Sequence, residues 1–265
     1  MHVSCGRSIA ALSLAFLFGC SVASAADEWG SIEGQFILEG DVPELPALVE
    51  KGNAAAKDAA VCAASGVPDD SLIVNPENLG IANVCLYIRK APKKIHPDLK
   101  ASAEPQVVFD QVGCRFTPHL LIVRTDQVVL VKSGDPINHN TRTSPFANKA
   151  ENLIIKPEER TGVQITMKQS ELNYPPVKVS CDIHPHMSAY WMVADHPYVA
   201  ITDADGKFKI ENLPVGEHTF RVWHERPGYI NCGEFKRDLK VTVKPGETTT
   251  LAPFKVPVAE FTKTK

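Results

Sequence analysis

The sequence is poor in long apolar runs and in the motifs of well-known enzyme sites. After the first 25 residues, no stretch approaches the roughly 20 apolar residues that a membrane-spanning helix needs. The chain has no Gly-x-Ser-x-Gly nucleophile motif, no phosphate-binding loop and no paired zinc-type cysteine motif. It also has no basic excess, because 28 Lys and Arg residues stand against 31 Asp and Glu residues. These absences give no support for a membrane-embedded protein, a hydrolase, a transferase or a nucleic-acid-binding protein.

The first 25 residues have the three-part pattern of a secretory signal. Arg7 precedes an apolar run at 9–19, and the small residues 23–25 follow it. We therefore predict an exported protein, periplasmic or extracellular. Cleavage takes the formal net charge from −3 to −4, because residues 1–25 contain one arginine and no acidic residue. Residues 17–20 also resemble a lipoprotein cleavage box, so a lipid anchor at Cys20 is the alternative to ordinary cleavage.

Five cysteines remain after cleavage at residue 25: Cys62, Cys85, Cys114, Cys181 and Cys232. Disulfides persist in an exported protein, and an odd count leaves one thiol for another task. If that thiol is Cys181, the other four are disulfide candidates with three possible pairings. The sequence does not decide among these pairings, although Cys62 is the partner that we favour for Cys114.

Short β-prone runs bounded by glycine, proline and asparagine predict an all-β protein. Between the first two runs, an alanine-rich stretch at 47–65 has the composition of a helix. Beyond a linker, the spacing of further runs is typical of a β-sandwich. The predicted strands are 31–38, 83–89, 106–110, 119–124, 127–132, 164–167, 177–180 and 190–194. The predicted sections are a signal peptide (1–25), an N-terminal β-rich region with its linker (26–104), a central domain (105–195) and a C-terminal β module (196–265).

Three soft or borderline metal ligands lie within the segment CDIHPHM. Cys181, His184 and Met187 have the spacing Cys-x-x-His-x-x-Met, and Pro185 stiffens the loop by fixing one backbone torsion. Thiolate, imidazole and a weak thioether are the ligands that copper uses for electron transfer. Such a site needs a second histidine.

The second histidine stands in the polar segment DPINHN, well before the cysteine. His139 is the candidate ligand there. Asn140 follows it and is placed to join the two ligand loops by side-chain hydrogen bonds. We predict one type 1 copper ion bound by His139, Cys181, His184 and Met187. The alternative interpretation makes Cys181 half of a disulfide and the other side chains packing residues.

Together, DPINHN and CDIHPHM resemble the two ligand loops of the cupredoxins, and the short Cys-x-x-His-Pro-x-Met loop is similar to that of amicyanin. The resemblance covers roughly residues 105–195 and implies a cupredoxin-like (amicyanin- or plastocyanin-like) Greek-key β-sandwich. The chain departs from the family in having His186 where an aromatic or apolar residue often stands, and in lacking a glycine soon after Met187.

The C-terminal section resembles the carboxypeptidase regulatory-like, or transthyretin-like, β module. The resemblance rests on Asp205-Gly206 with Phe208, and on the turn at Leu213, Pro214 and Gly216. It implies a small β-sandwich with a structural or adhesive role. The order of the two modules resembles the order found in exported methylamine-utilisation-like bacterial proteins.

Two other histidines lie near the proposed ligands in the sequence. His119, on a predicted strand, is either a metal ligand or a residue that contacts one, or else an ordinary strand histidine. His186, between Pro185 and Met187, is expected to point outward.

The first functional hypothesis is one-electron transfer with redox partner proteins of the cell envelope, through an exposed His184. The second is copper binding and storage. The third is a metal-free envelope or adhesion protein that binds carbohydrate. We do not predict an enzyme, because the 9 histidines include no His-x-His pair beyond the one in the ligand loop, and multicopper oxidases need further histidine clusters.

Overall fold

The computed structural model describes residues 1–2 and 28–262, which are almost entirely β-structure. The helical elements among these residues are short: α1 (Ala59–Cys62), α2 (Val258–Phe261) and the 3-10 turn η2 (Pro97–Leu99). No helix in this part of the chain is long and apolar enough to span a bilayer. The predicted all-β class is therefore confirmed. The predicted signal sequence and the candidate lipid site Cys20 lie outside the described residues, apart from residues 1–2.

Two facing sheets make up a sandwich from residues 106–194, called here the inserted sandwich. Its larger sheet has the order β5 (Leu120–Arg124), β11 (Ser188–Ala194), β10 (Val177–Ser180), β7 (His139–Ser144) and β8 (Asn152–Ile155). Its smaller sheet has the order β4 (Phe116–Thr117), β3 (Gln106–Gln111), β6 (Val128–Val131) and β9 (Val163–Thr166). Alternate residues of these strands point inward, as a strand that is buried on one face requires. Phe109, Val129, Val179 and Trp191 form the centre of their shared core.

A second sandwich, called here the outer sandwich, has strands from both ends of the chain. One sheet has the order β13 (Lys207–Pro214), β1 (Trp29–Glu39) and β19 (Thr248–Thr250), with β20 (Phe254–Pro257) also paired to β1. The other has the order β12 (Val199–Ile201), β2 (Cys85–Ile88), β14 (Gly216–His224) and β15 (Gly228–Tyr229), with β18 (Asp238–Val243) paired to β14. A short hairpin is made by β16 (Asn231–Cys232) and β17 (Phe235–Lys236).

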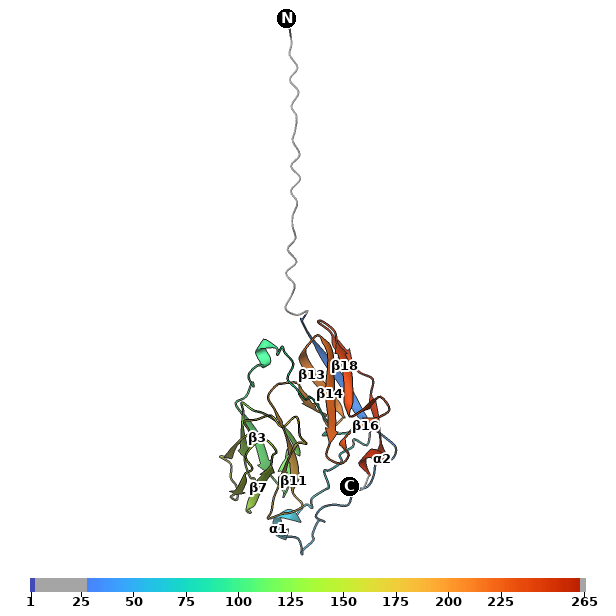
Figure 1. Cartoon of the computed structure of the whole chain (residues 1–265). Helices are drawn as coiled ribbons and strands as arrows, with labels where there is room; N and C mark the ends of the chain where they lie inside the picture. Colours follow the sequence, from blue (N-terminus) through green and yellow to red (C-terminus); the bar gives the residue numbers. More distant parts are fainter. Residues whose placement is uncertain (3–27, 263–265) are drawn as a thin grey trace.

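The structure joins two sections that the sequence prediction separated. The predicted N-terminal region (26–104) and C-terminal module (196–265) contribute strands to the same two sheets. Figure 1 shows this directly, because the blue strand β1 lies among the orange and red strands of the chain's other end. The physical reason is that β1 and β2 have no ladder partners within residues 28–104, so each pairs with C-terminal strands. The inserted sandwich therefore interrupts the outer one between β2 and β12.

A separate apolar cluster lies where the two sandwiches meet. Tyr87 and Trp223 come from the outer sandwich, and Leu120 and Met192 come from the inserted one. All four are buried. This contact gives the two sandwiches a shared apolar interface.

The alanine-rich stretch at 47–65 does not form the single helix that its composition predicts. Only α1 is helical there. Gly52 and Asp58 have positive φ values of 77° and 51°, and such residues interrupt a right-handed helix. The stretch forms a loop instead, and α1 lies at the end of the inserted sandwich near β7 and β11 (Figure 1).

Candidate metal centre

The candidate ligands meet at one end of the inserted sandwich because strand β7 begins there and its neighbour β10 ends there. His139 is the first residue of β7, and Cys181 directly follows β10. The two strands pair in antiparallel fashion, with Ser180 opposite Arg142. The loop that continues from Cys181 to Met187 then leads into β11.

The structure brings His139, Cys181 and His184 into one buried group. The two imidazole Nδ1 atoms are 3.0 Å apart, and the Cys181 Sγ lies 3.8 Å from the His184 Nδ1. One potential ligand atom from each residue lies within 4.8 Å of the others. Both histidines are 0% exposed, and Cys181 is 1% exposed.

A tight turn shapes the ligand loop between His184 and Met187. The Met187 N–H donates to the His184 carbonyl at 2.9 Å, and Pro185 occupies the second position of this turn, where its fixed φ is favoured. The Cys181 N–H donates to the Met187 carbonyl at 3.3 Å, which closes the loop. Met187 is buried in the apolar cluster that also contains Cys181.

Asn140 joins the two ligand segments. Its Oδ1 accepts hydrogen bonds from the backbone N–H groups of Asp182 (2.7 Å) and Ile183 (3.2 Å). Its own backbone N–H points at the Cys181 Sγ at 3.4 Å. The residue that follows His139 in the sequence therefore contacts both the sulfur and the loop that carries it.

A carboxylate contacts the remote nitrogen of each histidine. The Nε2 of His139 donates to Asp135 at 2.9 Å, and the Nε2 of His184 donates to Asp58 at 2.9 Å. An ionised carboxylate only accepts hydrogen bonds, so each neutral ring carries its proton on Nε2. Both Nδ1 lone pairs then face the same point beside a sulfur. This donor set fits a single soft or borderline cation, because two facing lone pairs repel each other unless a positive charge lies between them.

The electrostatics of the group agree with this view. Burial disfavours the Cys181 thiolate, but hydrogen bonding from His139 and from backbone N–H groups outweighs burial and lowers the pKa of this thiol. Burial also disfavours a charged His139, yet its hydrogen bonds with Asp135 and Cys181 raise its pKa to about 9. Burial lowers the pKa of His184, while Asp58 acts in the opposite direction. The 3.0 Å between the two Nδ1 atoms is a hydrogen-bond distance, which one proton shared by the histidine pair satisfies.

His184 is not the exposed residue that the sequence analysis expected. It is fully buried because residues 47–67 cover it, and Asp58 hydrogen-bonds its outer edge. Asp58 lies 126 positions before His184 in the chain, and no sequence signal pointed to it. Asp135 was visible in the segment DPINHN, four positions before His139, but its role was not predicted.

The two neighbouring histidines have other surroundings. His119 does not join the ligand group, because its Nε2 contacts the Glu225 carboxylate of the outer sandwich. His186 is half-buried rather than directed outward, and its Nε2 is buried. The His186 ring lies 6.0 Å from the His184 ring, measured between centroids. His119 therefore contributes to the contact between the sandwiches, and His186 packs next to the candidate site.

The five cysteines among residues 28–262 separate into one disulfide and three free thiols. Cys62 and Cys114 form a disulfide, which is the pairing favoured from the sequence. Cys85 and Cys232 are free, so they are wrong as disulfide candidates. Their surroundings explain this: Cys85 is buried at the interface between the sandwiches, and Cys232 packs against the core of the outer sandwich. Burial raises the pKa of the Cys85 thiol and, to about 11, that of Cys232, so both are poor nucleophiles for disulfide exchange.

Mass spectrometry of the non-reduced protein, alkylated while unfolded, checks this arrangement. We expect one linked peptide pair, Cys62 with Cys114, and alkylated peptides containing Cys85, Cys181 and Cys232. Cys181 is expected to be free because its sulfur faces two imidazoles. A native peptide that links Cys181 to another cysteine would contradict the proposed ligand set.

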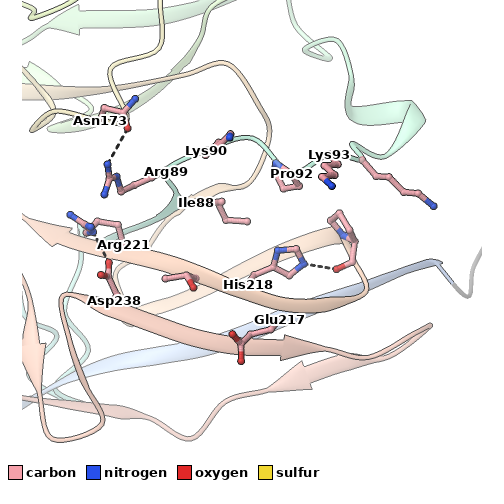
Figure 2. A pocket seen from close by; sticks show the side chains of 13 residues that line it. Ile88, Arg89, Lys90, Pro92, Lys93, Asn173, Glu217, His218, Arg221 and Asp238 are labelled. Carbon is pink, nitrogen blue, oxygen red and sulfur yellow. Dashed lines mark hydrogen bonds and ion pairs between the residues drawn. The ribbon is translucent and has the colours of Figure 1, made fainter.

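A large groove lies elsewhere, between the linker after β2 and strand β14 (Figure 2). It has a volume of about 690 Å³ and is lined by the basic residues Arg89, Lys90 and Lys93. Arg89 donates to Asn173 at 3.3 Å, and Arg221 donates to Asp238 at 2.7 Å. None of the residues that line the groove belongs to the candidate metal group.

No protein-family model matches the sequence, and no curated protein matches it. Among solved structures, a reduced amicyanin variant is 18% identical with a TM-score of 0.30, over 35% of this chain and 86% of its own. A purple cupredoxin from Nitrosopumilus maritimus is 14% identical with a TM-score of 0.27, over 34% of this chain and 100% of its own. A copper-containing nitrite reductase from Thermus scotoductus is 18% identical with a TM-score of 0.30, over 38% of this chain. The match spans only 25% of that enzyme. These similarities do not assign the chain to a family.

Proposed function

We propose that the inserted sandwich binds one copper ion through His139, Cys181, His184 and Met187, and that the protein transfers single electrons. The observation that carries this proposal is the convergence of two imidazole Nδ1 atoms and the Cys181 sulfur on one buried point. A bound copper ion would supply one-electron redox chemistry there. Met187 would supply a weak thioether ligand, which is suited to adjusting the reduction potential.

The protein's own residues hold this donor set in place before any ion binds. Asp135 and Asp58 orient the two imidazole rings, and Asn140 orients the sulfur. Asp135 is held in turn by the backbone N–H groups of Gly113 and Cys114. Such outer contacts increase metal affinity and reduce the rearrangement that accompanies a change of charge.

Copper storage is the second candidate function, and the burial of His184 favours it. An exposed ligand histidine offers a short path to a redox partner, whereas this one is covered by residues 47–67. Ready surrender of copper would favour storage, and reversible reduction with unchanged ligands would favour electron transfer. In either case we propose an exported protein that acts in the cell envelope without catalysing a reaction of its own; for electron transfer, its partners would be redox proteins there.

The direct test is to load the purified mature chain with copper and record the stoichiometry and the visible and electron paramagnetic resonance spectra. We expect one copper per chain and a type 1 signal, because the sulfur and both imidazoles can reach a single ion. A protein that binds copper without this signal would favour storage, and one that binds no copper would leave the metal-free envelope role as the better hypothesis.

Two neighbouring histidines provide a matched pair of variants for the ligand assignment. We expect His184→Ala to lose the type 1 spectrum and at least about 100-fold in copper affinity, since the loss of outer contacts alone costs about 10- to 100-fold. His186→Ala should keep the spectrum, because His186 is not part of the group in which the ligand atoms of His139, Cys181 and His184 converge. Paired copper titrations followed by visible spectroscopy measure both effects. Loss of colour in His186→Ala, with colour retained in His184→Ala, would refute the assignment.

A further inference from the structure

Residues 47–67 leave the outer sandwich, cover the end of the inserted sandwich and return. The segment is closed at its base by a backbone bridge between Val49 and Val67. Within it, the Gly52 N–H donates to the Ala63 carbonyl at 2.8 Å. The segment therefore behaves as one compact loop, called here the lid, and it contains α1.

The lid is fastened to the inserted sandwich by apolar packing. Val49, Cys62, Ala63 and Val67 are each at most 6% exposed and belong to the same core cluster as Cys181 and Met187. The lid thus fills space that borders the candidate metal site and excludes water from it.

A covalent bond fastens the same loop. The disulfide joins Cys62 of the lid to Cys114, which follows β3 in the inserted sandwich and lies 52 positions away. The sulfur atoms of both cysteines lie within 4.8 Å of a His184 ring nitrogen. The bridge therefore holds the lid at the point where it covers this histidine.

Asp58 provides the third contact between the lid and the inserted sandwich, and its backbone is held in a conformation that costs free energy. The residue has φ 51° and ψ 46°, in the left-handed region that residues other than glycine enter at a cost. In this conformation its carboxylate reaches the His184 Nε2 at 2.9 Å, and its carbonyl accepts the first hydrogen bonds of α1. The rest of the lid holds Asp58 against the ligand.

We propose that the lid must lift before a metal ion or a small ligand can reach His184, and that the Cys62–Cys114 disulfide keeps it closed. The part that concerns metal exchange rests on the proposed copper function. The part that concerns access to His184 does not, because it rests only on the burial of this ring and its contact with the lid. A closed lid makes the site slow to gain and slow to lose its ion, and it limits a redox partner to reaching the ligands through Asp58 or the loop surface.

The test measures the reaction of His184 with diethylpyrocarbonate in the metal-free full mature chain, followed by peptide mass spectrometry. We expect His184 to react slowly in the wild type and on the order of tenfold faster, or more, in the double variant Cys62→Ser with Cys114→Ser, since loss of the cross-link frees the open state. Cys232→Ser is the matched control, because it removes a thiol that forms no disulfide. It should react at the wild-type rate.

Asp58→Ala provides a second test of the lid if the double serine variant does not fold. This variant retains the disulfide and loses the hydrogen bond to His184, so we expect a rate between those of the wild type and an unfolded control. A wild-type His184 that reacts as fast as the unfolded control would overturn the proposal. So would a folded double serine variant that reacts at the wild-type rate.

A second arm follows the withdrawal of copper by a strong Cu(I) chelator. We expect the double serine variant to lose copper at least about tenfold faster than Cys232→Ser does. If neither protein binds copper, the proposed function fails, while the diethylpyrocarbonate result still decides whether the lid controls access to His184. If copper binds and leaves both proteins at the same rate, the lid does not control exchange.

Discussion

Replacing Cys181 with serine is expected to abolish the visible colour of the copper-loaded protein. The strong absorption of a type 1 site arises from the bond between copper and a thiolate, and a serine hydroxyl stays protonated near neutral pH. Copper affinity should also fall by at least about 100-fold, since even the loss of outer contacts costs about 10- to 100-fold. Visible spectra and a copper titration of the variant and the wild type, recorded side by side, measure both effects.

The chain supplies a matched control for this substitution. Cys85 is as buried as Cys181 but lies at the interface between the sandwiches, so Cys85→Ser makes the same chemical change away from the ligands. Cys85→Ser should keep the colour even if the protein becomes less stable. A fully coloured Cys181→Ser protein would disprove the ligand assignment, and a colourless Cys85→Ser protein would show that the loss of colour reports stability instead.

The ligand loop was accessible from the sequence because its members are close along the chain. Cys181, His184 and Met187 lie in one short loop, and local spacing determines which side chains meet there. His139 was found through the polar segment that surrounds it. Asp58 was not, because its contact with His184 depends on the route of the lid through space, and nothing in residues 47–65 marks that route.

Some strands could likewise be predicted from the sequence, and others could not. Runs of alternating apolar residues, such as β1 and β10, were predicted close to their observed bounds. Strand β7 was missed because its sequence HNTRTS is polar, although four of its six residues are buried. Its buried polar groups serve the candidate site: His139 contacts Asp135, and Asn140 contacts the sulfur. Function here overrides the hydrophobic pattern on which strand prediction depends.

The division into sections was wrong for a different reason. Periodicity shows that β1 and β2 are strands, but it does not show which strands they pair with. The partners of β1 are β13, β19 and β20, all more than 160 positions further along the chain. Because residues 196–265 resemble a complete small module, nothing indicated that this section also requires these two N-terminal strands.

A fragment of residues 196–262 is therefore expected to be unfolded by itself. Strand β1 lies between β13 and β19 and also pairs with β20, so its absence leaves three strands without their main ladder partner. Its buried side chains Ile32, Phe36 and Leu38 alone contribute about 5 to 9 kcal/mol. That contribution is comparable with the whole stability of a typical domain, about 5 to 15 kcal/mol. We expect no cooperative thermal transition for this fragment by circular dichroism, and poorly dispersed amide resonances.

The control is a chain that lacks only the inserted sandwich. Strands β2 and β12 are antiparallel neighbours, and the Ile88 N–H donates to the Tyr198 carbonyl at 3.3 Å, so the two cut ends lie side by side. A short turn can join residues 28–89 to residues 197–262 there, with Cys62→Ser added because Cys114 is removed. This chain keeps every strand of the outer sandwich and should unfold cooperatively, although it exposes the apolar faces of the lid and of the interface. A cooperative, well-dispersed 196–262 fragment would show that the C-terminal section is a complete module after all, with β1 and β2 as additions to it.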